Sequence, residues 1–346
     1  MRRCTLITGV AGTTGSQILR ELLEDMKSFE DIGIGKSRRI ILGCDNFFRG
    51  TPDNINEFTD NPNFNPNFQF IKCDFTEVLD IIRNTDLIVD TVYHMAAVVP
   101  TKYFYTAPEL TFQENCCKTI EFFKQCLAVP SIKQFVVGST SEVYGHIPYE
   151  YLPAKETTGS RFDSVENSTR WSYAEGKLLT EHILNKYSDQ IKVCHLRFAN
   201  TYGIGDLDNN HVIPYLINCV VNQEDIEVNS QPDQYFRTFL NNKDSARACI
   251  EVMRNGKSGT AYNVGSEEEI SIKQLLDLVL EVAESKGISY DGTVSYSIKR
   301  PGDPKRRVLD CTRLYRTTGF KPQVSLRDGI SEMFDVVIDN KRKECK

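Results

Sequence analysis

The sequence predicts an α/β protein with a Rossmann-type, doubly wound parallel sheet and a smaller α/β domain after it. Short apolar runs alternate with helical periods through the first half of the chain, which is the pattern of βαβ units. Glycines follow the first apolar run directly, where a helix should begin. Beyond residue 200 the alternation weakens, and Asn, Asp and Pro become frequent. We therefore expect one domain over residues 1–200 and a second over residues 201–346, with segments interleaved between them.

The predicted elements of the first domain follow in order. CTLIT (4–8) reads as the first strand, and apolar residues then recur at helical spacing from Ile18 to Met26. A further helical stretch covers residues near 107–127. The other apolar runs are short, and they predict strands over RIILGC (39–44), FQFIKC (68–73), TVYHM (91–95) and IKQFVV (132–137).

Composition and charge exclude several classes of protein. The formal net charge is −6 and no basic run is longer than KRRV (305–308), so we expect no nucleic-acid partner. No apolar run approaches the ~18 residues that a membrane-spanning helix needs, so we expect no membrane partner. The 11 cysteines are odd in number and lack CxxC spacing. We expect free thiols, no metal centre and a cytoplasmic location.

A glycine motif lies at the first strand-to-helix turn. Gly9, Gly12 and Gly15 form GxxGxxG, in which small residues let the backbone approach a pyrophosphate at the helix N-terminus. The alternative is a tight turn that binds nothing. Asp45 and Asp74 end the second and third predicted strands and favour the first interpretation, since a carboxylate there can bind an adenosine ribose. Such a carboxylate disfavours a 2′-phosphate, so NAD is expected over NADP.

WSYAEGK contains a tyrosine and a lysine four residues apart. On a helix Tyr173 and Lys177 share a face, where the ammonium can stabilise a phenolate and lower the pKa of the tyrosine. That pair predicts a general base. The alternative is a surface lysine beside a half-buried tyrosine, because the spacing is common by chance.

The stretch GSTSEVYG (138–145) follows the fifth apolar run. If the strand continues through it, Thr140, Glu142 and Tyr144 point to the same face, because side chains alternate along an extended chain. A carboxylate between two hydroxyls at a strand end is either a catalytic acid/base or a loop residue facing water.

Together these motifs resemble the extended short-chain dehydrogenase/reductases that modify nucleotide sugars. The resemblance covers nearly the whole chain in the expected order, and it includes YHMAA (93–97) and LRFANTYG (196–203). It implies an NAD-dependent enzyme, a nucleotide-sugar substrate and a homodimer that packs helices near residues 107–127 and 171–187.

The resemblance also implies roles for individual residues. Thr140, Tyr173 and Lys177 would be the catalytic Thr, Tyr and Lys. Asn115 would lie near the cofactor, and Ala96, in YHMAA, would line its nicotinamide side. Positions expected to hold the nucleotide diphosphate and its ribose are Asn200, Arg237, Arg300 and Asp303. Arginine suits phosphate through its forked, permanently charged donors, although each arginine taken singly could be an ordinary surface residue.

Glu142 bears on which reaction is catalysed. The 4-epimerases of this family usually carry a small or hydroxyl residue there, whereas 4,6-dehydratases and UDP-glucuronate decarboxylases carry Glu. TSE (140–142) resembles both the decarboxylases and the GDP-mannose dehydratases, and DNFFRG (45–50) resembles the decarboxylases. The GPR that many decarboxylases have after NTYG is absent. Decarboxylation of a UDP-glucuronate-like sugar is therefore expected, with dehydration and epimerisation as alternatives. A non-catalytic dinucleotide sensor is a more remote alternative, since this chain keeps the Thr, Tyr and Lys.

Overall fold

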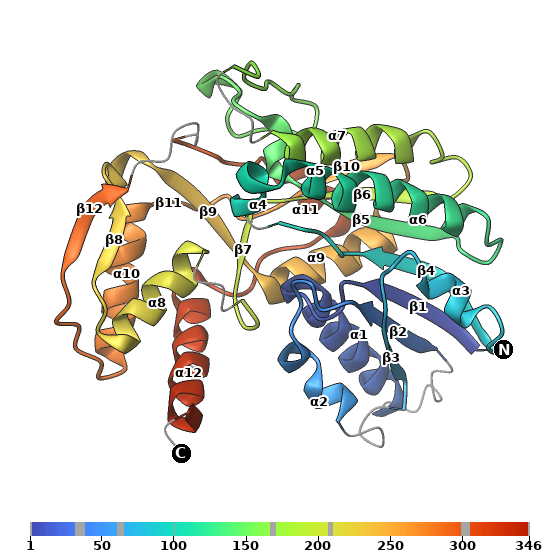
Figure 1. Ribbon diagram of the computed structural model, residues 1–346, viewed down its shortest axis with the longest axis horizontal. Coiled ribbons are helices and arrows are strands. Elements are labelled where there is room, and N and C mark those ends of the chain that lie inside the picture. Colours follow the sequence, from blue (N-terminus) through green and yellow to red (C-terminus); the bar gives the residue numbers. More distant parts are fainter. Residues whose placement is uncertain are drawn as a thin grey trace.

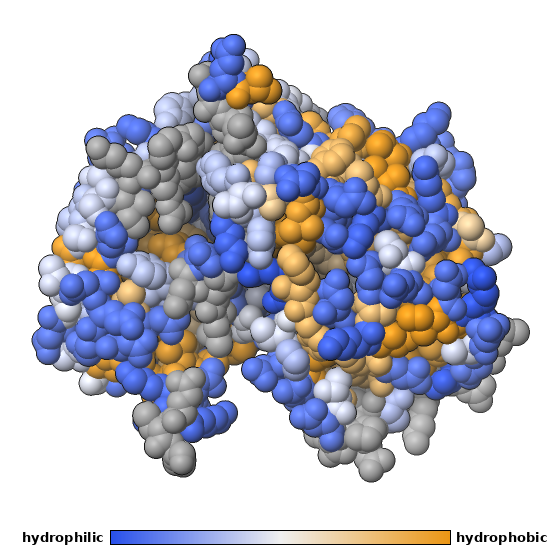
Figure 2. Space-filling view, viewed as in Figure 1, coloured by the Kyte–Doolittle hydropathy of each residue, from blue (hydrophilic) through white to orange (hydrophobic). Residues whose placement is uncertain are grey.

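The computed structural model describes residues 2–31, 39–60, 66–99, 101–166, 171–206, 210–298 and 305–344. Two lobes lie side by side in Figure 1: a large parallel sheet with helices on both faces, and two small sheets that pack with three helices. Between the lobes the molecular surface is hollowed, and hydrophilic side chains gather at the edge of the hollow (Figure 2).

The large sheet has seven strands, and every neighbouring pair is parallel. Their spatial order is β10-β6-β5-β4-β1-β2-β3, so the winding direction reverses between β1 and β4. In such sheets ligands bind at the carboxyl ends of the strands beside this reversal. The doubly wound fold is thus confirmed, with strands β1 (Arg2–Thr8), β2 (Ile40–Asp45), β3 (Phe68–Lys72), β4 (Leu87–His94), β5 (Gln134–Thr140), β6 (Lys192–Phe198) and β10 (Thr260–Val264).

Helices cover both faces of this sheet. One face is covered by α1 (Thr13–Asp31), α9 (Asn242–Asn255) and α11 (Thr312–Thr318), which pack on one another and share one apolar core. The opposite face carries α3 (Val78–Ile82), α5 (Pro108–Phe112), α6 (Lys118–Leu127) and α7 (Ser172–Asn185). Gln113–Cys117 forms a π-helical turn that joins α5 to α6. The short helices α2 (Asn56–Thr59) and α4 (Thr101–Thr106) lie in the connections after β2 and β4.

The smaller lobe has its own core. One of its sheets contains β7 (Asn200–Tyr202), β9 (Phe236–Asn241) and β11 (Glu269–Ser271), and the other contains β8 (Ile226–Asn229) and β12 (Val294–Ile298). Their apolar residues pack with α8 (Val212–Asn222), α10 (Ile272–Ser285) and α12 (Leu326–Glu344). The segment from α9 to β10 lies beyond residue 200, yet it belongs to the large sheet.

The sequence interpretation was wrong about one strand. β5 ends at Thr140, and residues Ser141–Tyr144 form a 3₁₀ helix, so positions 140, 142 and 144 do not share a strand face. Thr140 is the N-cap of this turn: its hydroxyl oxygen accepts a hydrogen bond of 3.2 Å from the backbone N–H of Glu142. The cap still brings Thr140 and Glu142 together, but it turns Tyr144 elsewhere.

None of the helices in the described ranges is long and apolar enough to cross a membrane.

Candidate active site

A cavity lies at the carboxyl ends of β1, β2 and β4, where the topology places ligands. Gly9 adopts φ +69°, and a Cβ built there would lie 2.6 Å from the backbone nitrogen of Ala96. A Cβ on Gly15 would lie 2.1 Å from the carbonyl oxygen of Gly9. A side chain at either position would fill the turn. Because both residues are glycines, the backbone at the start of α1 stays open. Gly9, Gly12, Asp45 and Ala96 all line this cavity.

The Asp45 carboxylate is fixed beside the glycine turn. Its two oxygens accept hydrogen bonds from the backbone N–H groups of Ala11, at 3.0 Å, and Phe47, at 2.8 Å. Burial raises the pKa of Asp45, and these N–H groups oppose the rise. Because a carboxylate offers about four acceptor positions, it can still receive hydroxyl donors from a ligand.

Asp74 has a different environment. Its carboxylate accepts hydrogen bonds from the Lys118 ammonium, at 2.9 Å, and from the Thr76 hydroxyl, at 2.8 Å. Burial raises the pKa of Asp74, but the hydrogen bonds from Lys118 and Thr76 outweigh it and leave the pKa below its usual value. Lys118, Cys73 and Phe75 form part of the cavity wall. Asp74 supports that part through its hydrogen bond with Lys118.

The segment after β4 forms another part of the wall, against Gly9. Met95, Ala96 and Val98 line the cavity. Asn115 is fully buried behind them: its amide donates to the Val98 carbonyl and accepts from the Val98 N–H, both at 2.8 Å. Asn115 therefore positions the cavity wall through Val98.

Thr140, Glu142 and Tyr173 meet between β5 and α7. The Thr140 side chain is close enough to the Tyr173 hydroxyl to influence its pKa. The Tyr173 ring stacks on Phe104 of α4, with ring centroids 4.6 Å apart and planes 9° from parallel. Burial raises the pKa of Tyr173 well above its usual value, the Glu142 carboxylate raises it further, and the Thr140 side chain lowers it.

Lys177 lies one turn after Tyr173 and is almost completely buried. Its ammonium donates to the Gly138 carbonyl oxygen at 2.9 Å. Burial lowers the pKa of Lys177 to about 8, while the Cys116 thiol and the Glu181 carboxylate oppose this. The expectation that Lys177 lowers the pKa of Tyr173 is therefore not met in this state, because burial of the phenol dominates and the ammonium is directed to the end of β5.

Glu142 forms an ion pair with a residue that the sequence interpretation did not assign. The Arg307 guanidinium lies 3.2 Å from the Glu142 carboxylate, and the two side chains are only 17% and 13% exposed. Glu142 is thus no solvated loop residue. The only sequence signal for Arg307 is the KRRV run, which does not indicate a partner 165 positions away.

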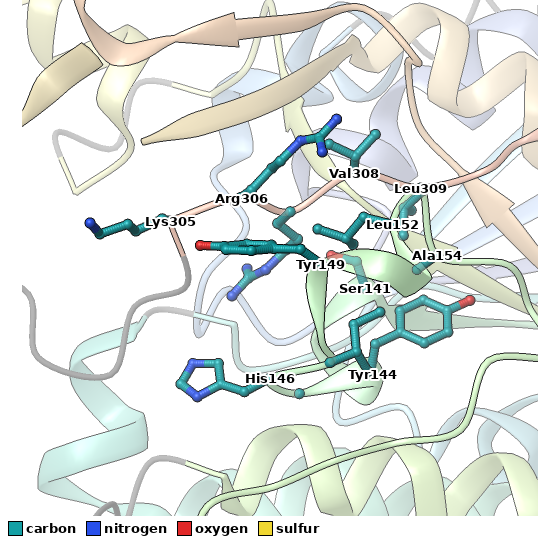
Figure 3. A pocket seen from close by; sticks show the side chains of 13 residues that line it. Ser141, Tyr144, His146, Tyr149, Leu152, Ala154, Lys305, Arg306, Val308 and Leu309 are labelled. Atoms are coloured by element: carbon teal, nitrogen blue, oxygen red, sulfur yellow. The ribbon is translucent and has the colours of Figure 1, made fainter. Parts of the chain in front are cut away.

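Arg307 also lines a second cavity, beside the 3₁₀ turn that carries Glu142. Its other walls come from the segment 144–154 and from residues 305–309. Figure 3 shows His146 and Lys305 toward one end of this cavity, while the Tyr144 ring points toward the other. The Tyr144 hydroxyl donates to the Asn263 side-chain oxygen at 2.6 Å, so Tyr144 is a structural residue of the turn.

A buried ion pair supports the catalytic turn and α7 together. Glu181, one turn beyond Lys177, accepts hydrogen bonds from Ser139 at 2.5 Å and from Arg197 at 2.6 Å. Arg197 also donates to the Tyr144 hydroxyl at 3.0 Å. Burial raises the pKa of Glu181, but the Arg197 hydrogen bond outweighs it and keeps the carboxylate charged. This pair connects β5, β6 and α7, which together carry the Thr140, Tyr173 and Lys177 cluster.

The predicted nucleotide-binding residues lie in the smaller lobe. Asn200 donates to the Thr238 carbonyl oxygen at 3.0 Å, and Arg237 donates to the Phe236 carbonyl oxygen at 2.8 Å. These bonds place both residues on neighbouring strands, β7 and β9. Arg300 and Asp303 lie outside the described residues.

The doubly wound sheet, the glycine cradle and the buried Thr-Tyr-Lys cluster define an extended short-chain dehydrogenase/reductase. A sequence model of the GDP-mannose 4,6-dehydratase family matches residues 6–333, and the chain belongs to that family. The expected family resemblance is thus confirmed.

Individual relatives are similar at modest identity. The chain is 26% identical to UDP-glucuronic acid decarboxylase 6 of Arabidopsis thaliana over 331 residues, which cover 95% of this chain and 87% of the relative. It is 27% identical to the UDP-N-acetyl-alpha-D-glucosaminuronate decarboxylase of Bacillus cytotoxicus, covering 96% and 97% of the two chains. Among solved structures, the UDP-glucose 4-epimerase of Thermus thermophilus in complex with NAD superimposes with a TM-score of 0.77 at 25% identity, covering 96% and 98%.

Proposed function

We propose that this protein modifies a nucleotide sugar through a 4-keto intermediate, with NAD as cofactor, and that the reaction is decarboxylation of a UDP-glucuronate-like substrate. The observation that carries the proposal is the half-buried Glu142–Arg307 pair beside Thr140 and Tyr173. The pair provides an acid/base group and a fixed positive charge at the position where the sugar must react.

The residues present fit a dinucleotide. The glycine turn leaves the space that a Cβ would fill, and the N-terminus of α1 offers N–H groups to a pyrophosphate. Asp45 would accept bonds from the adenosine ribose, and Asn115 would hold Val98 and its neighbours against the nicotinamide. When bound, NAD would supply the acceptor and later the donor of the hydride at C4.

Tyr173 would remove the proton from the sugar O4 hydroxyl, with Thr140 as the hydrogen-bonded link between them. A buried phenol with a raised pKa keeps its proton at neutral pH, so a nearby positive charge is needed to stabilise the phenolate that acts as the base. Lys177 contributes part of that charge. With its pKa near 8, Lys177 keeps its ammonium form at neutral pH despite burial.

Glu142 and Arg307 would act at C5. A sugar that carries a carboxylate on C5 becomes a β-keto acid once C4 is oxidised, and it then loses CO2. The substrate carboxylate can replace Glu142 as the partner of Arg307, because a guanidinium pairs with either carboxylate. Glu142, released beside C5, would take a proton from solvent and pass it to C5 in place of CO2.

One alternative is a 4,6-dehydratase, the activity after which the matching family model is named. In that reaction the substrate carries a hydroxyl on C6, and Glu142 would take the C5 proton while water leaves. A 4-epimerase needs only rotation of the ketone, and it gives neither Glu142 nor Arg307 a chemical task.

The nucleotide would lie against the smaller lobe. Arg237 is buried on β9, the strand that pairs with β7 at Asn200. We propose that both residues face the diphosphate and its ribose, together with Arg300 and Asp303. A panel of UDP-, GDP-, dTDP- and CDP-sugars separates the candidate reactions by product mass. Loss of CO2 from a UDP-uronate supports the proposal, whereas loss of water or an unchanged mass assigns the dehydratase or the epimerase.

We expect NAD to bind more tightly than NADP by about tenfold or more, a difference of roughly 1.4 kcal/mol, because a 2′-phosphate would meet the Asp45 carboxylate. Replacing Asp45 by Ala should weaken NAD binding and reduce the preference. Calorimetric titration of both cofactors measures this, with Asp53→Ala, which alters an exposed carboxylate, as the control for net charge. Equal or tighter NADP binding by the wild-type protein would contradict the assignment of Asp45.

We also propose a homodimer formed by α5, α6 and α7 of each copy. Hydrophobic side chains show over α7 in Figure 2. Leu179 of α7 and Phe112 of α5 are 44% and 38% exposed. Light scattering at micromolar concentration should give twice the chain mass, and Leu179→Glu should lower it toward the monomer. Tyr296→Glu, at an equally exposed position on β12, serves as the matched control. A monomeric wild-type mass would refute the dimer.

A further inference from the structure

Two aromatic rings meet beside the cofactor cavity, which lies at the carboxyl ends of β1, β2 and β4. Phe48 follows β2, lines this cavity and is 49% exposed. Tyr103 lies on α4, in the connection after β4, and outside the cavity lining. The two ring centroids are 6.0 Å apart and the planes are 38° from parallel. This separation is within the usual range for an interacting aromatic pair.

The contact joins two segments that leave the sheet on either side of β1. The strand order places β1 between β4 and β2, so the ends of β2 and β4 lie two strand spacings apart, roughly 10 Å. Gly9 and Gly12 follow β1 and line the cavity between these segments. Because Phe48 is half-exposed, the two rings cross the glycine turn on its outer side. A pyrophosphate bound at that turn would lie beneath them.

Hydrogen bonds fix the segment that carries Phe48. The Phe48 N–H donates to the Asn46 side-chain oxygen at 2.9 Å. Three residues later, the Thr51 N–H donates to the carbonyl oxygen of Ala11, in the glycine turn, at 3.2 Å. The Phe48 ring is therefore held at the rim of the cavity by backbone that belongs to the cavity itself.

On the other side, α4 carries two aromatic residues with different contacts. Phe104 stacks on Tyr173, which places the helix against the proposed catalytic cluster. Its neighbour Tyr103 reaches Phe48. Neither ring of the Phe48–Tyr103 pair belongs to the buried clusters that hold the sheet and its helices together. The contact can therefore open while the fold stays intact.

We propose that Phe48 and Tyr103 form an aromatic gate over the cofactor cavity, which opens when a dinucleotide enters or leaves and is closed in between. This inference rests on the proposed use of NAD. In that reaction the hydride taken from C4 returns to the same sugar, so the reduced cofactor has to stay bound through each cycle. A closed gate slows both entry and release, because the aromatic contact must break before either can occur.

Removal of each ring should have a different effect. Tyr103→Ala removes the gate contact from outside the cavity lining, so NADH should bind and leave about tenfold faster, with little change in its dissociation constant. Phe48→Ala breaks the same contact from the other side and also removes part of the cavity wall, so release should accelerate and affinity should fall. Because both substitutions break one contact, the double variant should release NADH no faster than Phe48→Ala alone.

The test loads the protein with NADH, adds excess NAD and follows release through the fluorescence of bound NADH, while rapid mixing measures association. Tyr105→Ala is the matched control, because Tyr105 lies on the same helix, is 52% exposed and lies outside the cavity lining. Its two rates should equal those of the wild type. Since Phe48 and Tyr103 lie on different segments, a disturbance of α4 alone would change the rates of Tyr103→Ala but not those of Phe48→Ala.

The measured rates separate the gate from the proposed function. Unchanged release in either Tyr103→Ala or Phe48→Ala overturns the gate. Faster release from Tyr103→Ala without faster entry also overturns it, since the ring would then hold the cofactor and not block its path. A wild-type protein that binds neither NADH nor NAD contradicts the proposed function and the gate together, whereas binding with equal rates in all variants contradicts the gate alone.

Discussion

Replacing Tyr173 by Phe is expected to reduce turnover by ~10²–10⁴-fold, the contribution typical of a general acid/base group. The substitution removes only the hydroxyl. Because the ring would keep its stacking on Phe104, the fold and the affinity for NAD should change little. Steady-state turnover and cofactor titration of the same preparation measure both effects.

Tyr187→Phe provides the matched control. Tyr187 follows the end of α7, and its ring packs against Phe123 of α6 with centroids 5.9 Å apart, away from the Thr140 and Lys177 cluster. Its loss of a hydroxyl should leave turnover near the wild-type value. If Tyr173→Phe retained activity within a few-fold of wild type, proton transfer by Tyr173 would be excluded.

Glu142→Gln is expected to have an effect of the same order, ~10²–10⁴-fold on turnover, because the amide keeps the size of the side chain but cannot exchange a proton at C5. The ion pair with Arg307 would also become a neutral hydrogen bond. Affinity for NAD should be unchanged, since Glu142 lies outside the cofactor cavity. Glu150→Gln, at an exposed position on the neighbouring turn, is the control.

The same variant should shift the pH dependence of the residual activity. Burial is the main cause of the raised pKa of Tyr173, and the negative charge of Glu142 raises it further. Removing that charge favours the phenolate, so the ascending limb of the pH profile should move to lower pH. If Glu142→Gln retained activity within a few-fold of wild type, an acid/base role for Glu142 would be excluded and the 4-epimerase would be favoured.

The parts of the fold that depend on local pattern could be predicted from the sequence. The glycine turn and the end of β2 at Asp45 lie where the sequence indicated, because alternating apolar runs and small residues at turns act over a few positions. The 3₁₀ turn was missed, although Thr140 followed by an acidic residue is a known helix-start signal. The apolar run before it favoured a longer strand.

The long-range contacts of the site could not be predicted in the same way. Arg307 reaches Glu142 only because the chain returns from the smaller lobe past the end of β5, and no periodicity carries that information. The position of Glu181 follows from the helix, since it lies one turn beyond Lys177, but its partner Arg197 lies on β6 and could not be predicted.

The central claim is that a 4-keto sugar loses CO2 and gains a proton at C5 through Glu142. It is tested most directly by incubating the protein with UDP-glucuronate in deuterated water and analysing the product by mass spectrometry and NMR. We expect a product that is lighter by one CO2 and carries one deuterium, at C5, while the hydrogen at C4 comes from the substrate. A product of unchanged mass, or one without deuterium at C5, would contradict it.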